Sequence, residues 1–168
     1  MNFTQKERTL LEDQKSHEQL CIQKYNNYAN MTQCPQLKSI LQQNGQVEQE
    51  HYNTIDQLLK GQMPQMQQSQ SSGQQQNQQQ QMSQQMQMNQ SSSFMPNAQT
   101  QNYNNSDKDL CTDLLMTEKY VSGAYNTAIF EFRDPQVRNI LNHIQKEEQQ
   151  HGESIFKYME SKGMYQAK

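Results

Sequence analysis

The chain has 168 residues and a net charge of −3, and its charged side chains lie only in residues 1–60 and 107–168. Neither segment has an excess of basic residues, so nucleic acid is not expected as a partner. The sequence has no apolar stretch of the length of a signal peptide or a membrane span. Its three cysteines include no Cys-x-x-Cys pair and do not indicate a disulfide scaffold. We therefore expect a protein made in the cytoplasm.

Residues 1–60 are predicted to form a helical hairpin. Thr4 and Glu7 have the spacing of a capping box, which marks the start of a first helix. Pro35 is suited to the first turn of a second helix, and Gly61 is suited to its C-terminal cap. The residues expected to face inward at helical spacing are Leu11, Glu18, Cys21, Tyr25 and Tyr28, followed by Leu37, Leu41, Asn44, Glu48, His51, Ile55 and Leu58.

Residues 61–106 differ sharply in composition. They include 18 Gln among 46 residues and no Asp, Glu, Lys, Arg or His. A segment with so little apolar surface is predicted to be a disordered, low-complexity linker rich in Gln, Met and Ser. As a flexible coil it spans about 35–40 Å, close to the length of a helix of about 25 residues. It is either a simple tether or a segment that promotes self-association or cross-linking through Gln.

Residues 107–168 are predicted to form a second hairpin. Ser106 can cap its first helix, Asp134 and Pro135 mark the start of its second helix, and Gly163 closes that helix. The residues expected to face inward are Cys111, Leu114, Glu118, Val121, Tyr125, Ala128 and Phe132, followed by Val137, Leu141, Ile144, Glu148, His151, Ile155 and Tyr158.

The two hairpins repeat one pattern one hundred positions apart. Each contains a Glu and, thirty residues later, a Glu-x-x-His, and Tyr25 and Pro35 also match Tyr125 and Pro135. A lone hairpin buries its apolar face poorly, so we expect the two to pack together as an all-α four-helix bundle. The candidate metal ligands are Glu18, Glu48, His51, Glu118, Glu148 and His151.

These six side chains are expected to lie at one level of the bundle. All four glutamates are fifteen residues from the centre of their hairpin turn, which is about 22 Å along a helix. Four buried carboxylates must bind cations, share protons or face water. Two Mn or Fe ions would balance them, with the imidazoles as neutral ligands; a protonated hydrogen-bond network is the alternative. His17 and His143 lack repeat partners and are expected at the surface, and Glu50 and Glu147 lie off the inward stripe.

The last third of the chain resembles a known family. The resemblance rests on Asp-Leu-Leu-Met-Thr-Glu-Lys (113–119), Tyr-Asn-Thr-Ala (125–128), Asp-Pro-Gln-Val-Arg (134–138), Glu-Glu-Gln-Gln-His (147–151) and Gly-Met-Tyr (163–165). These residues resemble the spore coat protein F (CotF) family. Residues 48–51, Glu-Gln-Glu-His, match more weakly. The resemblance implies a ferritin-like fold, synthesis in the mother cell and assembly with other proteins into the spore coat.

The resemblance and the ligand pattern lead to two functional hypotheses. The first is a structural spore coat protein with a buried dinuclear metal site. The alternative is a di-manganese or di-iron oxidoreductase of the catalase or peroxide-scavenging type, located in the coat. In that enzyme the two metals would be bridged by Glu48 and Glu148 or by Glu18 and Glu118. Metal storage would require a shell-forming oligomer, for which the sequence gives no sign.

Overall fold

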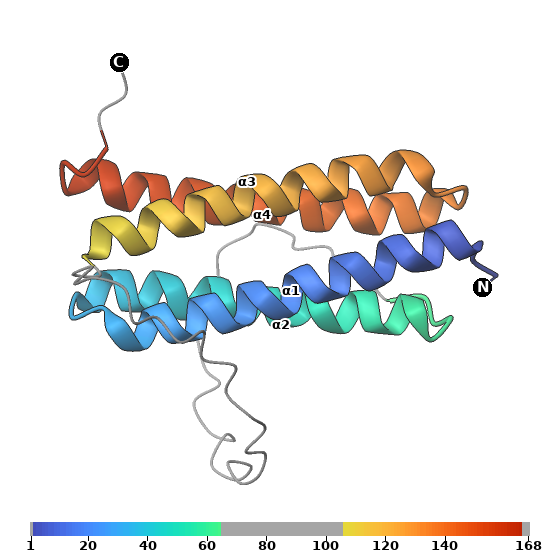
Figure 1. The fold of residues 1–168 in the computed structure, drawn as a ribbon, viewed down its shortest axis with the longest axis horizontal. Coiled ribbons are helices and arrows are strands. Elements are labelled where there is room, and N and C mark those ends of the chain that lie inside the picture. Colours follow the sequence, from blue (N-terminus) through green and yellow to red (C-terminus); the bar gives the residue numbers. More distant parts are fainter. Residues whose placement is uncertain (1, 65–105, 166–168) are drawn as a thin grey trace, which may run out of the picture. The chain divides into compact units, whose positions relative to one another are not determined.

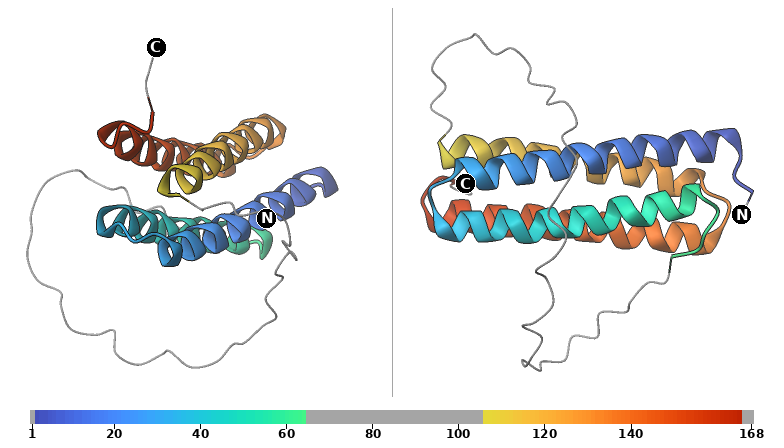
Figure 2. Two further views of the ribbon diagram at one scale, coloured as in Figure 1. Left: turned by 60° about the vertical axis from the view of Figure 1, so that its left-hand side comes forward. Right: turned by 90° about the horizontal axis from the view of Figure 1, so that it is seen from below.

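The computed structural model describes residues 2–64 and 106–165, and within these ranges the chain contains four helices and no strand. They belong to one compact unit. The helices are α1 (Gln5–Met31), α2 (Pro35–Leu59), α3 (Asp107–Glu131) and α4 (Pro135–Ser161). Figures 1 and 2 show two antiparallel hairpins, α1–α2 and α3–α4, packed against each other. The predicted all-α four-helix architecture is confirmed, whereas most of the predicted linker at 61–106 lies outside the described residues.

The N-termini of the helices follow from local capping chemistry. Thr4 Oγ1 accepts a hydrogen bond from the Glu7 amide at 3.2 Å, and Glu7 Oε2 accepts one from the Thr4 amide at 2.7 Å. This reciprocal pair is the predicted capping box. Ser106 and Asp134 cap α3 and α4 in the same way, each with a side-chain oxygen that accepts an amide hydrogen bond. The four helix starts are therefore encoded by single residues, with Pro35 in the first turn of α2.

A glycine follows the second helix of each hairpin. Gly61 has φ 77° and Gly163 has φ 68°, a left-handed conformation that residues with a Cβ rarely adopt. The sequence predicted Gly61 as the C-cap of α2, but the observed C-cap is Lys60, one residue earlier. The helix still ends where the glycine allows the chain to turn away.

The two hairpins point in opposite directions. The turn between α1 and α2 lies at the start of α3, where Thr32 Oγ1 donates to Asp107 Oδ1 at 2.7 Å. The turn between α3 and α4 lies at the start of α1, where the Arg133 amide donates to Glu7 Oε1 at 3.0 Å. Consequently α1 is antiparallel to α3, and α2 is antiparallel to α4.

This arrangement separates the end of α2 from the start of α3. The Leu59 carbonyl lies 3.5 Å from Nη1 of Arg8, near the start of α1. Asp107 contacts Thr32, just beyond the opposite end of α1. The 24 residues from Arg8 to Thr32 rise about 36 Å. The end of α2 and the start of α3 therefore lie at opposite ends of α1.

The core consists of the predicted inward stripes of the four helices. All the inward residues predicted from the sequence are buried except Tyr28, which is half-buried. Further buried side chains, which the sequence analysis did not place on a stripe, are Glu7, Gln14, Ala29, Thr32, Leu110, Ile140 and Met159. Cys21 and Cys111 are buried and free, as expected for small apolar side chains. The polar residues on these inward stripes are therefore held in the interior by the apolar residues that pack above and below them.

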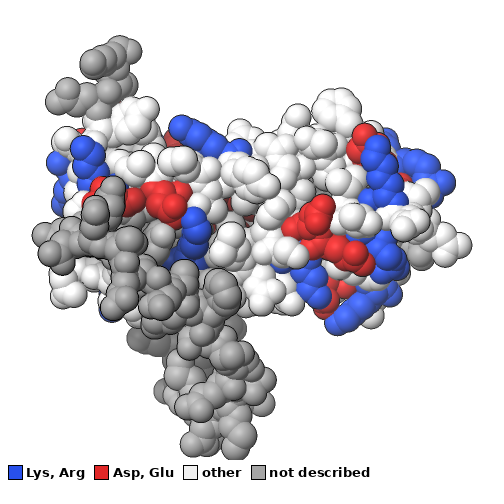
Figure 3. Space-filling view, in the orientation of Figure 1, with Lys and Arg blue, Asp and Glu red and all other residues white. Residues whose placement is uncertain are grey.

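The outer surface carries both signs of charge. Figure 3 shows basic and acidic side chains intermixed on one face of the described residues, without an extended basic patch. Several form ion pairs, such as Lys24 with Asp113 at 2.7 Å. Among the residues that the structure describes, no helix is long and apolar enough to cross a membrane.

Candidate metal centre

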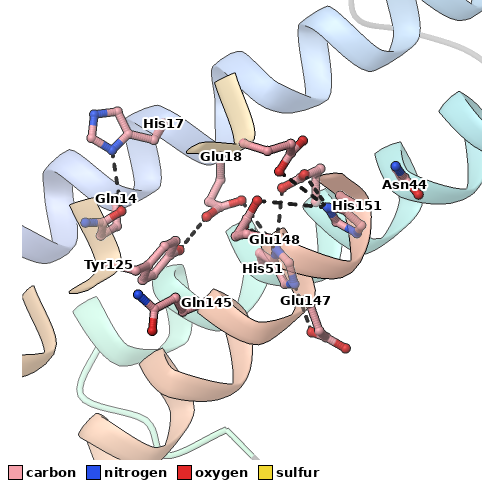
Figure 4. A network of polar contacts seen from close by, with 12 residues as sticks. Gln14, His17, Glu18, Asn44, His51, Tyr125, Gln145, Glu147, Glu148 and His151 are labelled. Carbon is pink, nitrogen blue, oxygen red and sulfur yellow. Dashed lines mark hydrogen bonds and ion pairs between the residues drawn. The ribbon is translucent and has the colours of Figure 1, made fainter. Parts of the chain in front are cut away.

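The structure brings all six predicted ligands together in the middle of the bundle. We call them the six-residue cluster: Glu18, Glu48, His51, Glu118, Glu148 and His151. Each of these residues is at most 4% exposed. Every helix contributes, with one Glu from α1, one Glu from α3, and a Glu-x-x-His from α2 and from α4. Figure 4 shows Glu18 of α1, His51 of α2, and Glu148 and His151 of α4 converging.

The first half of the cluster surrounds His51. Its Nδ1 lies 3.1 Å from Glu148 Oε1, 3.4 Å from Glu48 Oε2 and 3.6 Å from Glu18 Oε2. One donor atom from each of these four residues lies within 4.8 Å of the others. His51 and Glu48 are three residues apart on α2, which puts them on the same helical face. This group of one imidazole and three carboxylates has the composition and size to hold one cation.

The second half of the cluster surrounds His151 and has the same composition. Nδ1 of His151 lies 2.8 Å from Glu48 Oε1 and 3.9 Å from oxygens of Glu118 and of Glu148. Glu48 and Glu148 thus belong to both groups, whereas Glu18 belongs only to the first and Glu118 only to the second. Of the two bridging arrangements considered from the sequence, the geometry favours the pair Glu48 and Glu148.

Two tyrosines connect the cluster across the hairpins. The Tyr25 hydroxyl donates a hydrogen bond to Glu118 Oε1, and the Tyr125 hydroxyl donates one to Glu18 Oε1. We call Glu18 and Glu118, which each belong to only one group, the terminal glutamates. Tyr25 lies on α1 seven residues, or about two turns, after Glu18, and Tyr125 lies on α3 at the same distance after Glu118. Asn44 Nδ2 lies 3.3 Å from the Tyr25 hydroxyl. The sequence repeat places Tyr25 and Tyr125 at matching positions. This match was the only sequence signal of their hydrogen bonds to the glutamates, which were not predicted.

His51 has a further carboxylate on the outer side of its ring. Glu147 Oε2 lies 2.9 Å from His51 Nε2 and 3.4 Å from His143 Nε2. The sequence analysis omitted Glu147, because it lies beside the inward stripe of α4. Its side chain reaches the facing helix α2, as Figure 4 shows. The matching position in the first hairpin is Val47, so the repeat itself gave no indication of this contact.

Neither unmatched histidine is fully exposed. His17 is half-buried; its ring lies edge-on to Tyr120 with centroids 5.3 Å apart, and its Nδ1 lies 3.4 Å from Gln14 Oε1. His143 is also half-buried, beside Glu147. The expectation that both lie at the surface is therefore only partly met. Neither residue belongs to the six-residue cluster, which agrees with their exclusion from the ligand set.

Burial controls the protonation of the carboxylates. Loss of hydration raises the pKa of Glu18 and of Glu148 to about 7, and it also raises the pKa of Glu48 and of Glu118. The neighbouring carboxylates add to this effect, because two close negative charges repel each other. Without a cation, the cluster therefore binds protons at neutral pH. This is the alternative state considered from the sequence, and the geometry permits it.

The two histidines differ in their electrostatic environment. Burial by itself would lower the pKa of His51, but the carboxylates of Glu147 and Glu148 raise that pKa well above its ordinary value. Burial lowers the pKa of His151, with the charge of Glu118 acting in the opposite direction. The extra carboxylate of Glu147 thus distinguishes two otherwise similar halves of the cluster.

The cluster also contains unsatisfied polar atoms. Within the described residues, six of its buried side-chain atoms have no hydrogen-bond partner: Glu18 Oε2, Glu48 Oε2, His51 Nδ1, Glu118 Oε2, Glu148 Oε1 and Glu148 Oε2. Buried polar atoms normally have a partner, because leaving one unpaired costs about 1–3 kcal/mol. Carboxylate oxygens combined with imidazole nitrogen suit Fe and Mn. The two groups are therefore buried sites that could each hold a metal ion.

The second hairpin is similar to a known protein domain. Residues 106–168 match the Coat F domain. No curated protein and no solved structure matched the chain. The matched region contains Glu118, Glu148 and His151, whereas the other three members of the cluster come from α1 and α2, outside the matched residues. The complete cluster thus combines the region that is similar to the Coat F domain with the hairpin that precedes it.

Proposed function

We propose that this protein is a structural component of a bacterial spore coat and that it holds two divalent cations, Mn or Fe, in the six-residue cluster. The match of residues 106–168 to the Coat F domain supports the coat assignment. The six buried atoms that make no hydrogen bond, all on members of the cluster, are the observation that carries the metal assignment.

Charge balance explains the number of cations. The cluster holds four carboxylates and two imidazoles, so two divalent ions neutralise it when all four glutamates are ionised. Glu18 and His51 would hold one ion, Glu118 and His151 would hold the other, and Glu48 and Glu148 would be shared. A single ion would leave two buried carboxylates to be neutralised by protons, because a bare buried carboxylate costs several kcal/mol.

Metal binding would give the bundle mechanical cohesion. The ligands come from all four helices, so the ions would join the two hairpins in the middle of a long interface. A ligand that binds only the folded state stabilises that state by mass action. A cross-linked bundle of this kind suits a protein that must persist in an assembled shell.

Contacts with other coat proteins are part of this proposal. The Gln-rich segment would promote self-association or cross-linking, because Gln-rich tracts associate readily and Gln side chains can be joined to Lys. Replacing it with a Gly- and Ser-rich segment of equal length should leave the bundle folded and reduce incorporation into the coat. Normal incorporation of that variant would contradict a role for this segment in assembly.

Metal analysis of the purified protein tests the central claim. Wild-type protein should contain two Mn or Fe ions per chain and unfold at a lower temperature after chelation. The double variant His51→Ala and His151→Ala should lose the ions, whereas the half-buried control His17→Ala should retain them. If the wild-type protein binds no ion stoichiometrically and its unfolding is the same in chelator, the metal-binding proposal is wrong.

A second candidate function is a two-metal oxidoreductase that removes peroxide. It is favoured by the sharing of Glu48 and Glu148 between the two groups, because two adjacent redox metals can act together on one substrate. Peroxide consumption by the Mn-loaded protein, lost in the double histidine variant, would support it. Stoichiometric metal without peroxide consumption would leave the structural function.

A further inference from the structure

A groove of about 640 Å³ lies between α3 and α4, beside the six-residue cluster. Its lining includes two members of the cluster, Glu118 and Glu148. Both carboxylates are at least nine-tenths buried and have oxygens without a hydrogen-bond partner within the described residues. The groove therefore reaches from the surface of one hairpin to the ligands of the candidate centre.

The lining of this groove includes two glycines and four neutral polar residues, together with the charged side chains of Lys119 and Glu153. Gly123 and Gly152 lie on its walls. A Cβ added at Gly123 would meet nothing within 4 Å, and one added at Gly152 would meet only Glu118 Cβ, at 3.8 Å. Further lining residues offer hydroxyl or amide oxygens: Ser122, Asn126, Gln145 and Gln149. Such oxygens can replace part of the hydration shell of a hard cation.

The matching positions of the first hairpin differ in size and charge. Under the hundred-residue shift, Gly152 corresponds to Tyr52 and Leu115 corresponds to Lys15. Lys15 Nζ lies 5.0 Å from the centre of the Tyr52 ring and 2.6 Å from Asp56 Oδ1. An aromatic ring and an ammonium group thus meet between α1 and α2, where the second hairpin has a glycine and a leucine. The large Tyr52 side chain thus stands where the second hairpin has only a glycine.

We propose that the α3–α4 groove is the route by which divalent cations enter the cluster, with Glu118 and Glu148 as the first ligands that they meet. This inference rests on the proposed function, since it requires a metal centre. The buried carboxylates supply the attraction, and the neutral oxygens of the walls supply intermediate ligands. The groove thus gives the cluster an opening to the surface on the α3–α4 side.

The variant Gly152→Tyr tests this route by giving α4 the residue that α2 carries. Metal-free protein would be mixed with Co²⁺, and uptake would be followed by visible absorbance in a stopped-flow instrument. We expect Gly152→Tyr to take up Co²⁺ at least about tenfold more slowly than the wild type, with the same two ions bound at the end. Gly152→Ala is the matched control, because its methyl group leaves the groove open, and it should load at the wild-type rate.

A second variant covers the case in which Gly152→Tyr does not fold. Gly123→Phe fills the groove from α3, where a side chain meets no atom at its first carbon. It should slow uptake in the same way. If folded protein with either large side chain binds two ions at the wild-type rate, the route is wrong while the metal centre stands. If the wild-type protein binds no Co²⁺, both the centre and the route are wrong.

Discussion

Glu147 of α4 contacts the outer nitrogen of His51 on α2, with Oε2 2.9 Å from Nε2. His51 Nδ1 faces the other carboxylates of the cluster, at 3.1 Å from Glu148 Oε1. A carboxylate in this position fixes the orientation of the ring and its protonated nitrogen, and it increases the basicity of the nitrogen that faces the site. Val47 occupies the matching position of the first hairpin, so this support is unequal in the two halves of the repeat.

Replacement of Glu147 should therefore weaken one metal site more than the other. We expect Glu147→Gln to lower the affinity of the group around His51 by about 10–100-fold, while the group around His151 changes little. Titration calorimetry should then resolve two binding steps that are closer together in the wild type. Glu50→Gln, at an exposed position of α2, is the control and should match the wild type. Equal weakening of both steps by Glu147→Gln would contradict this assignment.

The two tyrosines should stabilise the bundle through the terminal glutamates. Tyr125→Phe removes the hydroxyl that donates to Glu18 Oε1 and leaves a buried oxygen without its donor. We expect a loss of about 1–3 kcal/mol in the free energy of unfolding, measured by urea denaturation in chelator. Tyr25→Phe should cost as much or more, because Asn44 also loses its contact with the Tyr25 hydroxyl.

Tyr28→Phe provides the comparison for both tyrosine variants. The Tyr28 hydroxyl donates to Asp113 at 2.7 Å, but this residue is half-buried and Asp113 also pairs with Lys24. Water and the lysine can compensate for the lost hydroxyl, so a change below about 1 kcal/mol is expected. A loss for Tyr28→Phe as large as for Tyr125→Phe would show that burial within the cluster is not the cause.

Much of this fold follows from the sequence, because its signals are local. Thr4, Ser106 and Asp134 set helix starts through their own side chains, and helical spacing places the inward residues. The relative direction of the hairpins did not follow. All four glutamates lie near mid-height, so parallel and opposed hairpins would both bring them level. Contacts between the hairpins, such as Thr32 with Asp107, decide the direction.

The candidate site shows the same division between local and long-range information. The repeat identified its six members, because equivalent residues recur at a fixed shift. It did not identify Glu147, which lies off the inward stripe of its own helix and contacts His51 only because α2 and α4 pack together. A residue that contacts a neighbouring helix in only one of the two hairpins leaves no repeated signal in the sequence, since Val47 stands at the position that matches Glu147.

Glu7 should make the stability of the bundle depend on pH. Burial by itself would raise its pKa, but hydrogen bonds from Arg133 and Thr4 outweigh this and lower the pKa from 4.5 to about 2. A carboxyl with a lowered pKa in the folded state stabilises it above the unfolded pKa, and this contribution is lost as the pH falls from about 4.5 toward 2. Its size at neutral pH is about 2–3 kcal/mol.

Glu7→Gln should therefore lower the free energy of unfolding near neutral pH and reduce its decline in acid. Urea denaturation across a pH series, compared with the wild type, measures the difference. Glu12→Gln, an exposed position on the same helix, should retain the wild-type pH profile. If Glu7→Gln and the wild type decline in parallel between about pH 5 and pH 2, the hydrogen bonds to Arg133 do not contribute in this way.

The opposed hairpins set a minimum length for their connection. The end of α2 and the start of α3 lie at opposite ends of α1, about 36 Å apart along its axis. A fully extended chain covers about 3.3–3.6 Å per residue, so about eleven residues are required. Deletion of residues 62–105 would join Gly61 directly to Ser106 and could not close the bundle within one chain.

We expect that deletion to give a dimer in which hairpins exchange between chains, because the apolar stripes still need partners. A replacement segment of about 20 Gly and Ser residues is long enough to restore the monomer. Light scattering and circular dichroism on both variants provide the measurement. A helical monomer after complete deletion would contradict the opposed arrangement of the hairpins, since only hairpins with neighbouring ends can be joined so closely.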